Sequence, residues 1–167
     1  MAATAGATVS QDKNRSRGPL VVFTLDGGRY ALRLESVERV LPTVAVTPLP
    51  KAPAIVTGII NLAGRILPVL DIRRRFGLPP REPGLYDHLI VAHTARRTVT
   101  LAVDKSQGVL GIPAEAAVPR EEILPRVEYL EGVVKLGGGL ILIHDLETFL
   151  SLDEERSLAA ALEGRES

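Results

Sequence analysis

The sequence contains no cysteine and no tryptophan, and it has only three tyrosines and three phenylalanines among 167 residues. Without cysteine, neither a disulfide framework nor a thiolate metal cluster is available, which fits a reducing compartment. With so few aromatic rings, the hydrophobic core has to be built from valine, leucine and isoleucine.

Net charge and long apolar runs are also absent. Twenty basic and 20 acidic residues cancel, so the overall charge attracts neither a polyanion nor an anionic membrane surface, and no nucleic-acid partner is expected. No stretch approaches the roughly 20 apolar residues of a membrane span, and the first 18 residues lack the apolar core of a signal peptide. A soluble, cytoplasmic protein without direct membrane insertion is therefore expected.

Three segments differ in composition. Residues 1–18 are small, polar and without periodicity, which predicts a disordered N-terminal tail. Residues 19–151 are rich in short aliphatic runs separated by turn signals, which predicts a mainly β domain. Residues 152–167, which contain "DEERSLAAALEG", predict a C-terminal helix or tail with Ser151 or Asp153 as its cap.

The sequence repeats itself. "GIINLAGRILPVLDI" at residues 58–72 is echoed by "GVVKLGGGLILIHDL" at residues 132–146. At this offset of 74 residues, Gly58, Leu62, Gly64 and Asp71 recur as Gly132, Leu136, Gly138 and Asp145. Each copy predicts a hairpin, and Pro68 suggests that the return strand of the first hairpin is an edge strand or carries a bulge.

A second offset, of 69 residues, aligns "LVVFTLDGGRYALRLESVERVL" with "LIVAHTARRTVTLAVDKSQGVL". Any two aliphatic hairpins resemble each other, but here the order of the elements also agrees. We therefore predict a duplicated unit of about five short strands, with "LPPREPG" as the linker between the copies. Each unit is near the lower size limit for a stable core, so the two halves are expected to share hydrophobic surface.

No motif for catalysis or for a cofactor is present. The sequence has no GxSxG elbow, Walker loop or GxGxxG, and no pair of histidines has the spacing of a zinc site. Asp71 and Asp145 resemble a carboxylate pair, yet each ends a strand before a short helical turn, where a cap needs a short acceptor. Arg73, Arg74 and Arg75 fan out around a short helix, so at least one is expected to be solvated or ion-paired. We predict a protein that is not an enzyme and that has no cofactor and no metal.

Several expected strands, such as "LIVA" and "LILI", are apolar on both faces. Such strands indicate either an interface between the two halves or a surface for another protein. The pattern therefore favours a function in binding.

Taken together, "FTLDGGRYALRLESVERVL", "PLPKAPAIVTGIINL" and "ILPVLDI" closing on "RRRFG" resemble, in order and spacing, the CheW family of bacterial chemotaxis scaffolds. The similarity continues through "TVTLAVDKSQGVLGI" to "LEGVVKLGGGLILIHDLETFL" and covers residues 19–151. It implies two five-stranded SH3-like β-barrel subdomains that share a hydrophobic core.

The resemblance also implies partners. It implies a non-enzymatic adaptor that couples the regulatory domain of a CheA-type histidine kinase to the cytoplasmic tip of a chemoreceptor and allows self-association in arrays. Exposed barrel edges and the groove between the barrels would make the contacts. Carried over by position, the partner-binding candidates are Val37, Arg39, Val40, Gly58, Asn61, Ala63, Gly64, Leu89 and Val109.

Two candidates depart from the family pattern. The family commonly has arginine in an Asn-Leu-Arg-Gly run where Ala63 stands, and it often has an acidic residue where Arg39 stands. Ala63 removes a positive charge and Arg39 removes a negative one, so the two departures suggest a paired change in a single interaction. Arg65, two residues after Ala63, is a candidate to supply a positive charge in its place. The alternatives are a CheW-like kinase regulator of a specialised pathway without receptor coupling, and an enzyme or small-ligand binder that uses the groove.

Overall fold

The computed structural model describes residues 18–111, 130–137 and 139–166. The expected tail, residues 1–18, lies outside the described residues except for its last residue. The ten strands of the described part are β1 (Leu20–Leu25), β2 (Gly28–Arg33), β3 (Val37–Pro42), β4 (Val56–Leu62), β5 (Arg65–Leu70), β6 (His88–His93), β7 (Thr98–Val103), β8 (Lys105–Leu110), β9 (Leu130–Leu136) and β10 (Gly139–His144). The helical elements are η1 (Leu34–Ser36), α3 (Ile72–Arg75), η4 (Leu146–Thr148) and α4 (Leu152–Glu166).

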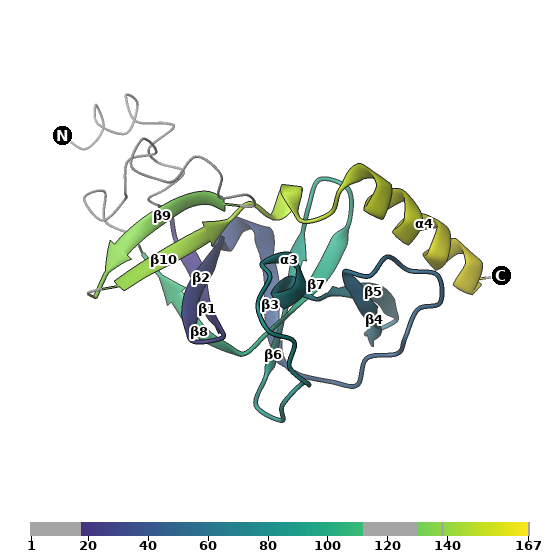
Figure 1. Cartoon of the computed structure of the whole chain (residues 1–167), viewed down its shortest axis with the longest axis horizontal. Coiled ribbons are helices and arrows are strands. Elements are labelled where there is room, and N and C mark those ends of the chain that lie inside the picture. Colours follow the sequence, from purple (N-terminus) through teal and green to yellow (C-terminus); the bar gives the residue numbers. More distant parts are fainter. Residues whose placement is uncertain (1–17, 112–129, 138, 167) are drawn as a thin grey trace.

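The strands form two five-stranded sheets, which confirms the mainly β prediction (Figure 1). Sheet A has the order β8-β1-β2-β10-β9, and sheet B has the order β3-β6-β7-β5-β4. Each sheet therefore takes two strands from one half of the sequence and three from the other half. A cut at the linker would divide both sheets, so the halves are interleaved rather than side by side. Closure of each sheet into an SH3-like barrel stays a prediction.

The strand pairing repeats with the same two offsets as the sequence. In sheet A, β10 runs parallel to β2 with Ile143 opposite Ala31. In sheet B, β5 runs parallel to β7 with Val69 opposite Thr100, which is the corresponding pair. The register shifts in the strand pairing repeat as well. Strands β3 and β8 each carry one at equivalent positions, and so do strands β4 and β9.

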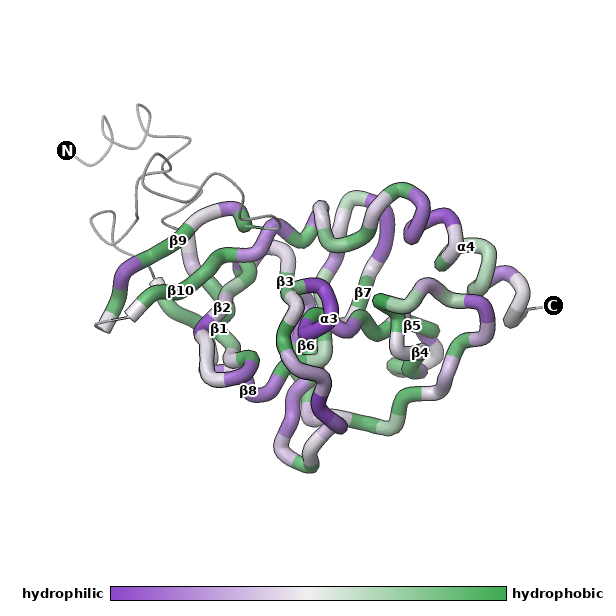
Figure 2. Tube along the Cα trace, viewed as in Figure 1, coloured by the Kyte–Doolittle hydropathy of each residue, from purple (hydrophilic) through white to green (hydrophobic). Residues whose placement is uncertain are grey.

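Strand β1 is buried on both faces. Leu20 and Val22 belong to a small cluster inside sheet A, whereas Val21 and Phe23 belong to the large cluster that also contains residues of sheet B and α4. Strand β6 behaves in the same way in sheet B. The two-sided apolar pattern of these strands therefore reflects a core shared by the two sheets, and Figure 2 shows that β4, β5 and β10 are also mainly hydrophobic.

Pro68 does not lie on an edge strand, so this part of the prediction is wrong. Strand β5 lies between β7 and β4 in sheet B. Its pairing with β7 covers only Val69 and Leu70, however, so the residue without an N–H lies just before that ladder. The bulge of this hairpin lies in β4, between Val56 and Gly58.

The helical turns begin at the expected caps. The side chain of Asp71 accepts a hydrogen bond from the backbone N of Arg74, and Asp145 accepts one from Glu147. Both aspartates therefore act as helix caps, as predicted. At the start of α4, the Ser151 hydroxyl accepts from the backbone N of Glu154, whose carboxylate accepts from the N of Ser151. This reciprocal pair is a capping box.

Candidate protein-binding surface

Two edge strands occupy equivalent positions in the two sheets. Strand β3 ends sheet B and β8 ends sheet A, and the 69-residue offset relates one strand to the other. Val40 on β3 is 38% exposed, and its equivalent Val109 on β8 is 61% exposed. Each edge thus combines backbone hydrogen-bonding groups without a neighbouring strand in the sheet with an exposed apolar side chain, which is the surface used for strand addition or docking.

The β4–β5 turn explains three of the candidates. Ala63 and Gly64 have φ angles of 52° and 89°, as a two-residue hairpin turn with both central residues left-handed requires. The Asn61 side chain accepts a hydrogen bond of 2.8 Å from the backbone N of Gly64. Asn61 and Gly64 therefore shape the turn, and Ala63 presents only a methyl group where the family pattern has arginine.

Two candidates lie beneath the surface. Leu89 is 2% exposed and belongs to the cluster inside sheet B. A Cβ atom on Gly58 would lie 2.2 Å from the carbonyl oxygen of Thr47 and 2.7 Å from a methyl carbon of Val46, so the residue allows a close approach of two backbone segments. Both positions therefore support packing within the fold, and their part in partner binding stays a prediction.

The charges near β3 are arranged around Arg65. Its guanidinium donates a hydrogen bond of 2.7 Å to the Glu38 carboxylate and one of 3.2 Å to the hydroxyl of Thr98. The hydrogen bond from Arg65 holds the pKa of Glu38 below its ordinary value. Arg65, at the start of β5, therefore places a positive charge beside β3. Its carboxylate partner is Glu38, which lies next to the exposed Arg39. Val37, on the same strand, packs against the shared core.

The arginine run of α3 makes structural ion pairs. Arg73 is buried and contacts the Asp104 carboxylate at 2.6 Å, and Arg75 contacts Glu154 at 2.6 Å. Although burial of Asp104 acts to raise its pKa, the hydrogen bonds from Arg73 and Arg81 lower that pKa to about 2. The run thus joins α3 to the rest of the fold, which confirms the expectation of ion pairing.

The histidines do not form a metal site. His144 is 2% exposed and lies among the rings of Phe23, Tyr30, Phe76 and Phe149. Burial lowers its pKa to about 3, so its ring is neutral in the folded protein. Within the described ranges, no group of three or more His, Cys, Asp or Glu side chains has an arrangement that could hold a metal ion.

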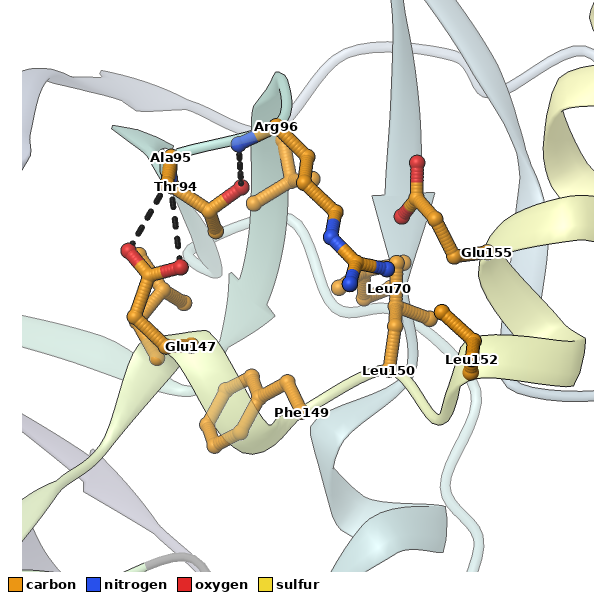
Figure 3. A pocket seen from close by; sticks show the side chains of 11 residues that line it. Leu70, Thr94, Ala95, Arg96, Glu147, Phe149, Leu150, Leu152 and Glu155 are labelled. Carbon is orange, nitrogen blue, oxygen red and sulfur yellow. Dashed lines mark hydrogen bonds between the residues drawn. The ribbon is translucent and has the colours of Figure 1, made fainter.

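A small cavity of about 340 Å³ lies where the β6–β7 turn meets η4 and the beginning of α4 (Figure 3). Glu147 on one side accepts hydrogen bonds from the backbone N of Ala95, and Arg96 and Glu155 border the opening. We name this cavity the η4 pocket. Its apolar lining consists of Leu70, Val99, Leu146, Phe149, Leu150 and Leu152.

Two exposed residues were missed in the sequence. Leu85 and Tyr86 are 89% and 86% exposed, and they lie between Gly84 and Asp87 just before β6. A Leu-Tyr pair directly after the proline-rich linker was the available signal. Within the described segments, no helix is long and apolar enough to cross a membrane.

Comparison with known proteins gives consistent matches. The family model described as the CheW-like domain matches residues 19–154. A probable chemotaxis protein CheW from Rhizobium etli is 30% identical over 102 residues, which cover 61% of this chain and 66% of the relative. The chemotaxis protein CheW from Thermotoga maritima is 31% identical over 77% of this chain and 84% of its own length.

A solved structure shares the fold. The scaffolding protein TtCheW from Thermoanaerobacter tengcongensis superposes with a TM-score of 0.74 at 28% identity, over 83% of this chain and 95% of that protein. The family match spans both sheets and reaches the first residues of α4. The chain therefore belongs to the CheW family of non-enzymatic chemotaxis scaffold proteins.

Proposed function

We propose that this protein is a cytoplasmic adaptor that couples the regulatory domain of a CheA-type histidine kinase to the cytoplasmic tip of a chemoreceptor. The observation that carries the proposal is the pair of equivalent apolar edges, β3 with Val40 and β8 with Val109. Because the edges belong to different sheets, one molecule offers two separate docking strands. That is the minimum an adaptor needs to hold two partners at once.

Each contact taken singly is expected to be weak. An edge strand with one exposed valine contributes a small interface, which is typical of transient signalling contacts. Stable assembly then depends on several such contacts acting together. Rim charges such as Arg39 set partner choice and the rate of association more than affinity.

Binding of the two partners by separate variants tests the proposal. We expect the wild-type protein to bind the kinase regulatory domain and the receptor tip, and we expect Val40→Asp and Val109→Asp each to weaken one partner by at least tenfold. Leu140→Asp is the matched control, because Leu140 is a similarly exposed residue on β10, away from both edges. Absence of binding to either partner at tens of micromolar, with protein shown to be folded, contradicts the proposal.

The second candidate function is kinase regulation without receptor coupling. It is favoured by Ala63 and by Arg39, which replace the charges that the family commonly has at these positions. In this case the wild-type protein binds the kinase domain alone. Restoration of both charges, Ala63→Arg with Arg39→Glu, then produces receptor binding that the wild-type protein lacks, whereas a wild-type protein that already binds the receptor excludes this alternative.

A further inference from the structure

The η4 pocket is enclosed by three segments that side-chain contacts hold together. The Glu147 carboxylate, on η4, accepts from the backbone N of Ala95 in the β6–β7 turn at 3.0 and 3.2 Å. The Arg97 guanidinium, at the end of the same turn, donates to Glu155 of α4 at 2.5 Å. These contacts fix the turn, η4 and α4 relative to one another, so the cavity exists before any ligand enters. Binding therefore requires little ordering of the protein.

The floor of the pocket is apolar and reaches the core. Leu70 and Val99 are each 1% exposed, and Phe149 is 2% exposed. Leu152 also lines the cavity but is 51% exposed, which places a large apolar side chain at its mouth. An exposed leucine beside an apolar cavity indicates a surface that an apolar ligand covers.

The size of the cavity limits the ligand. Its volume is about 340 Å³, and a water molecule occupies about 30 Å³ in the liquid, so there is room for about eleven non-hydrogen atoms. A small molecule fits this space, whereas a folded partner can at most place a side chain in it.

The charges around the opening leave one cation without a partner. Two carboxylates, Glu147 and Glu155, face two guanidinium groups, those of Arg96 and Arg97. Glu147 already accepts from the β6–β7 turn, and Glu155 is paired with Arg97. Among the residues that the structure describes, Arg96 has no ion-pair partner. In Figure 3 its side chain extends from the turn into the middle of the pocket-lining side chains.

We propose that the η4 pocket binds a small monocarboxylate with an apolar body of about eight carbon atoms. The apolar body fills the floor, and the carboxylate accepts two parallel hydrogen bonds from the guanidinium of Arg96. A single negative charge fits because one cation is unpaired, whereas both carboxylates at the opening already have partners. This site is separate from the β3 and β8 edges, so the inference does not rest on the proposed function.

Titration of the full chain with sodium octanoate, followed by amide NMR, tests the site. We expect saturable shifts in residues 94–97 and 146–152, with a Kd of about 100 µM. At 1 mM octanoate the melting temperature is expected to rise by about 4 °C. Acetate lacks the apolar body and octylammonium has the opposite charge, so each is expected to bind at least tenfold more weakly than octanoate.

Two substitutions separate the charge from the apolar surface. Arg96→Glu is expected to reverse the preference, so that octylammonium binds more tightly than octanoate. Leu152→Glu removes apolar surface and adds a negative charge at the mouth, and it is expected to weaken octanoate at least tenfold. Both variants are compatible with folding, because both side chains are exposed and glutamate is favourable in the first turn of α4.

Arg156→Glu is the matched control. Arg156 is an exposed arginine of α4 that does not line the pocket, and its substitution makes the same change in net charge as Arg96→Glu. We expect this variant to bind octanoate like the wild-type protein.

Four results would overturn the proposal. They are the absence of saturable shifts at 5 mM octanoate in folded protein, octylammonium that binds the wild-type protein as tightly as octanoate, an affinity for octanoate that Arg96→Glu and Leu152→Glu leave unchanged, and an equal loss of affinity in Arg156→Glu. The last result would show that octanoate responds to the overall charge of the protein and not to Arg96. Because no kinase domain or receptor enters the measurement, its outcome is independent of the proposed function.

Discussion

Arg73 donates two hydrogen bonds to the carboxylate of Asp104, at 2.8 and 2.6 Å. The pair joins α3, which belongs to the first repeat, to the chain between β7 and β8 of the second repeat. Arg81 contacts the same carboxylate from the linker, and the backbone N of Asp26 donates to it from the β1–β2 turn. One carboxylate thus connects both sheets and the base of the turn that presents Leu85 and Tyr86.

Removal of the buried cation should destabilise this junction. We expect Arg73→Ala to lower the free energy of unfolding by about 3 kcal/mol, because it leaves a partly buried carboxylate with fewer partners. Urea unfolding followed by circular dichroism measures the change. Arg74→Ala is the control, since Arg74 is exposed on the same short helix. A loss for Arg73→Ala no larger than that of the control would show that the pair does not stabilise the fold.

Gly58 and its equivalent Gly132 should respond differently to the same change. We expect Gly58→Ala to destabilise the protein by about 2 kcal/mol, because the new methyl group overlaps the Thr47 carbonyl. At Gly132 the nearest atom to an added Cβ is a methyl carbon of Ile143 at 3.8 Å, so Gly132→Ala should cost much less. Thermal unfolding of the two variants side by side measures this difference. Equal melting temperatures would contradict the close approach at Gly58.

Local features of the fold were predictable from the sequence. The hairpin turns are marked by residues that tolerate a positive φ, such as Asp26 and Gly27 in the first turn and Gly64 in the β4–β5 turn. The caps Asp71 and Asp145 were predictable because the residue before a helical turn needs a short acceptor. The repeat of the strand order was visible because both copies keep the same succession of apolar runs and turns.

Non-local features were not predictable in the same way. The residues of a strand do not reveal which strand pairs with it. The pairing of β2 with β10 and of β5 with β7, in which strands of different halves lie side by side, therefore had no local signal in the sequence. The burial of Leu89 was missed because a resemblance between sequences identifies the equivalent position but does not tell how exposed the side chain is there. The exposed Leu85 and Tyr86 were missed because the ion pairs that hold their turn, from Arg81 to Asp87 and Asp104, form only in the folded protein.

The left-handed Ala63 gives a test of the β4–β5 turn. We expect Ala63→Gly to raise the free energy of unfolding by about 1 kcal/mol, because glycine adopts a φ of 52° without the steric cost that a Cβ brings. Chemical unfolding is the measurement, and Ala159→Gly in the interior of α4 is the control, which should lose about the same amount. A destabilised Ala63→Gly protein would mean that the turn is not left-handed at this residue.

His144 should make stability fall in mild acid. Burial lowers its pKa from 6.5 to about 3, so between these pH values the unfolded chain binds a proton that the folded protein does not. The contribution that neutral His144 makes to the free energy of unfolding is therefore fully present above pH 6.5 and is lost as the pH falls toward 3. From pH 7 to pH 5 the loss is expected to be about 2 kcal/mol. The lowered carboxylate pKa values affect stability only at lower pH, since Asp104 and Glu154 start from 3.8 and 4.5.

Urea unfolding at pH 7 and at pH 5 measures this loss in three variants. His144→Phe and His144→Leu cannot bind the proton, so their stability should change little between the two pH values. Both are used because phenylalanine and leucine fill the site among Phe23, Tyr30 and Phe76 differently, so a packing defect in one does not hide the effect. His93→Gln, at an exposed position, should keep the full dependence. If both His144 variants lose as much stability as the wild-type protein, the acid sensitivity arises elsewhere and His144 is not held neutral by the ring cluster.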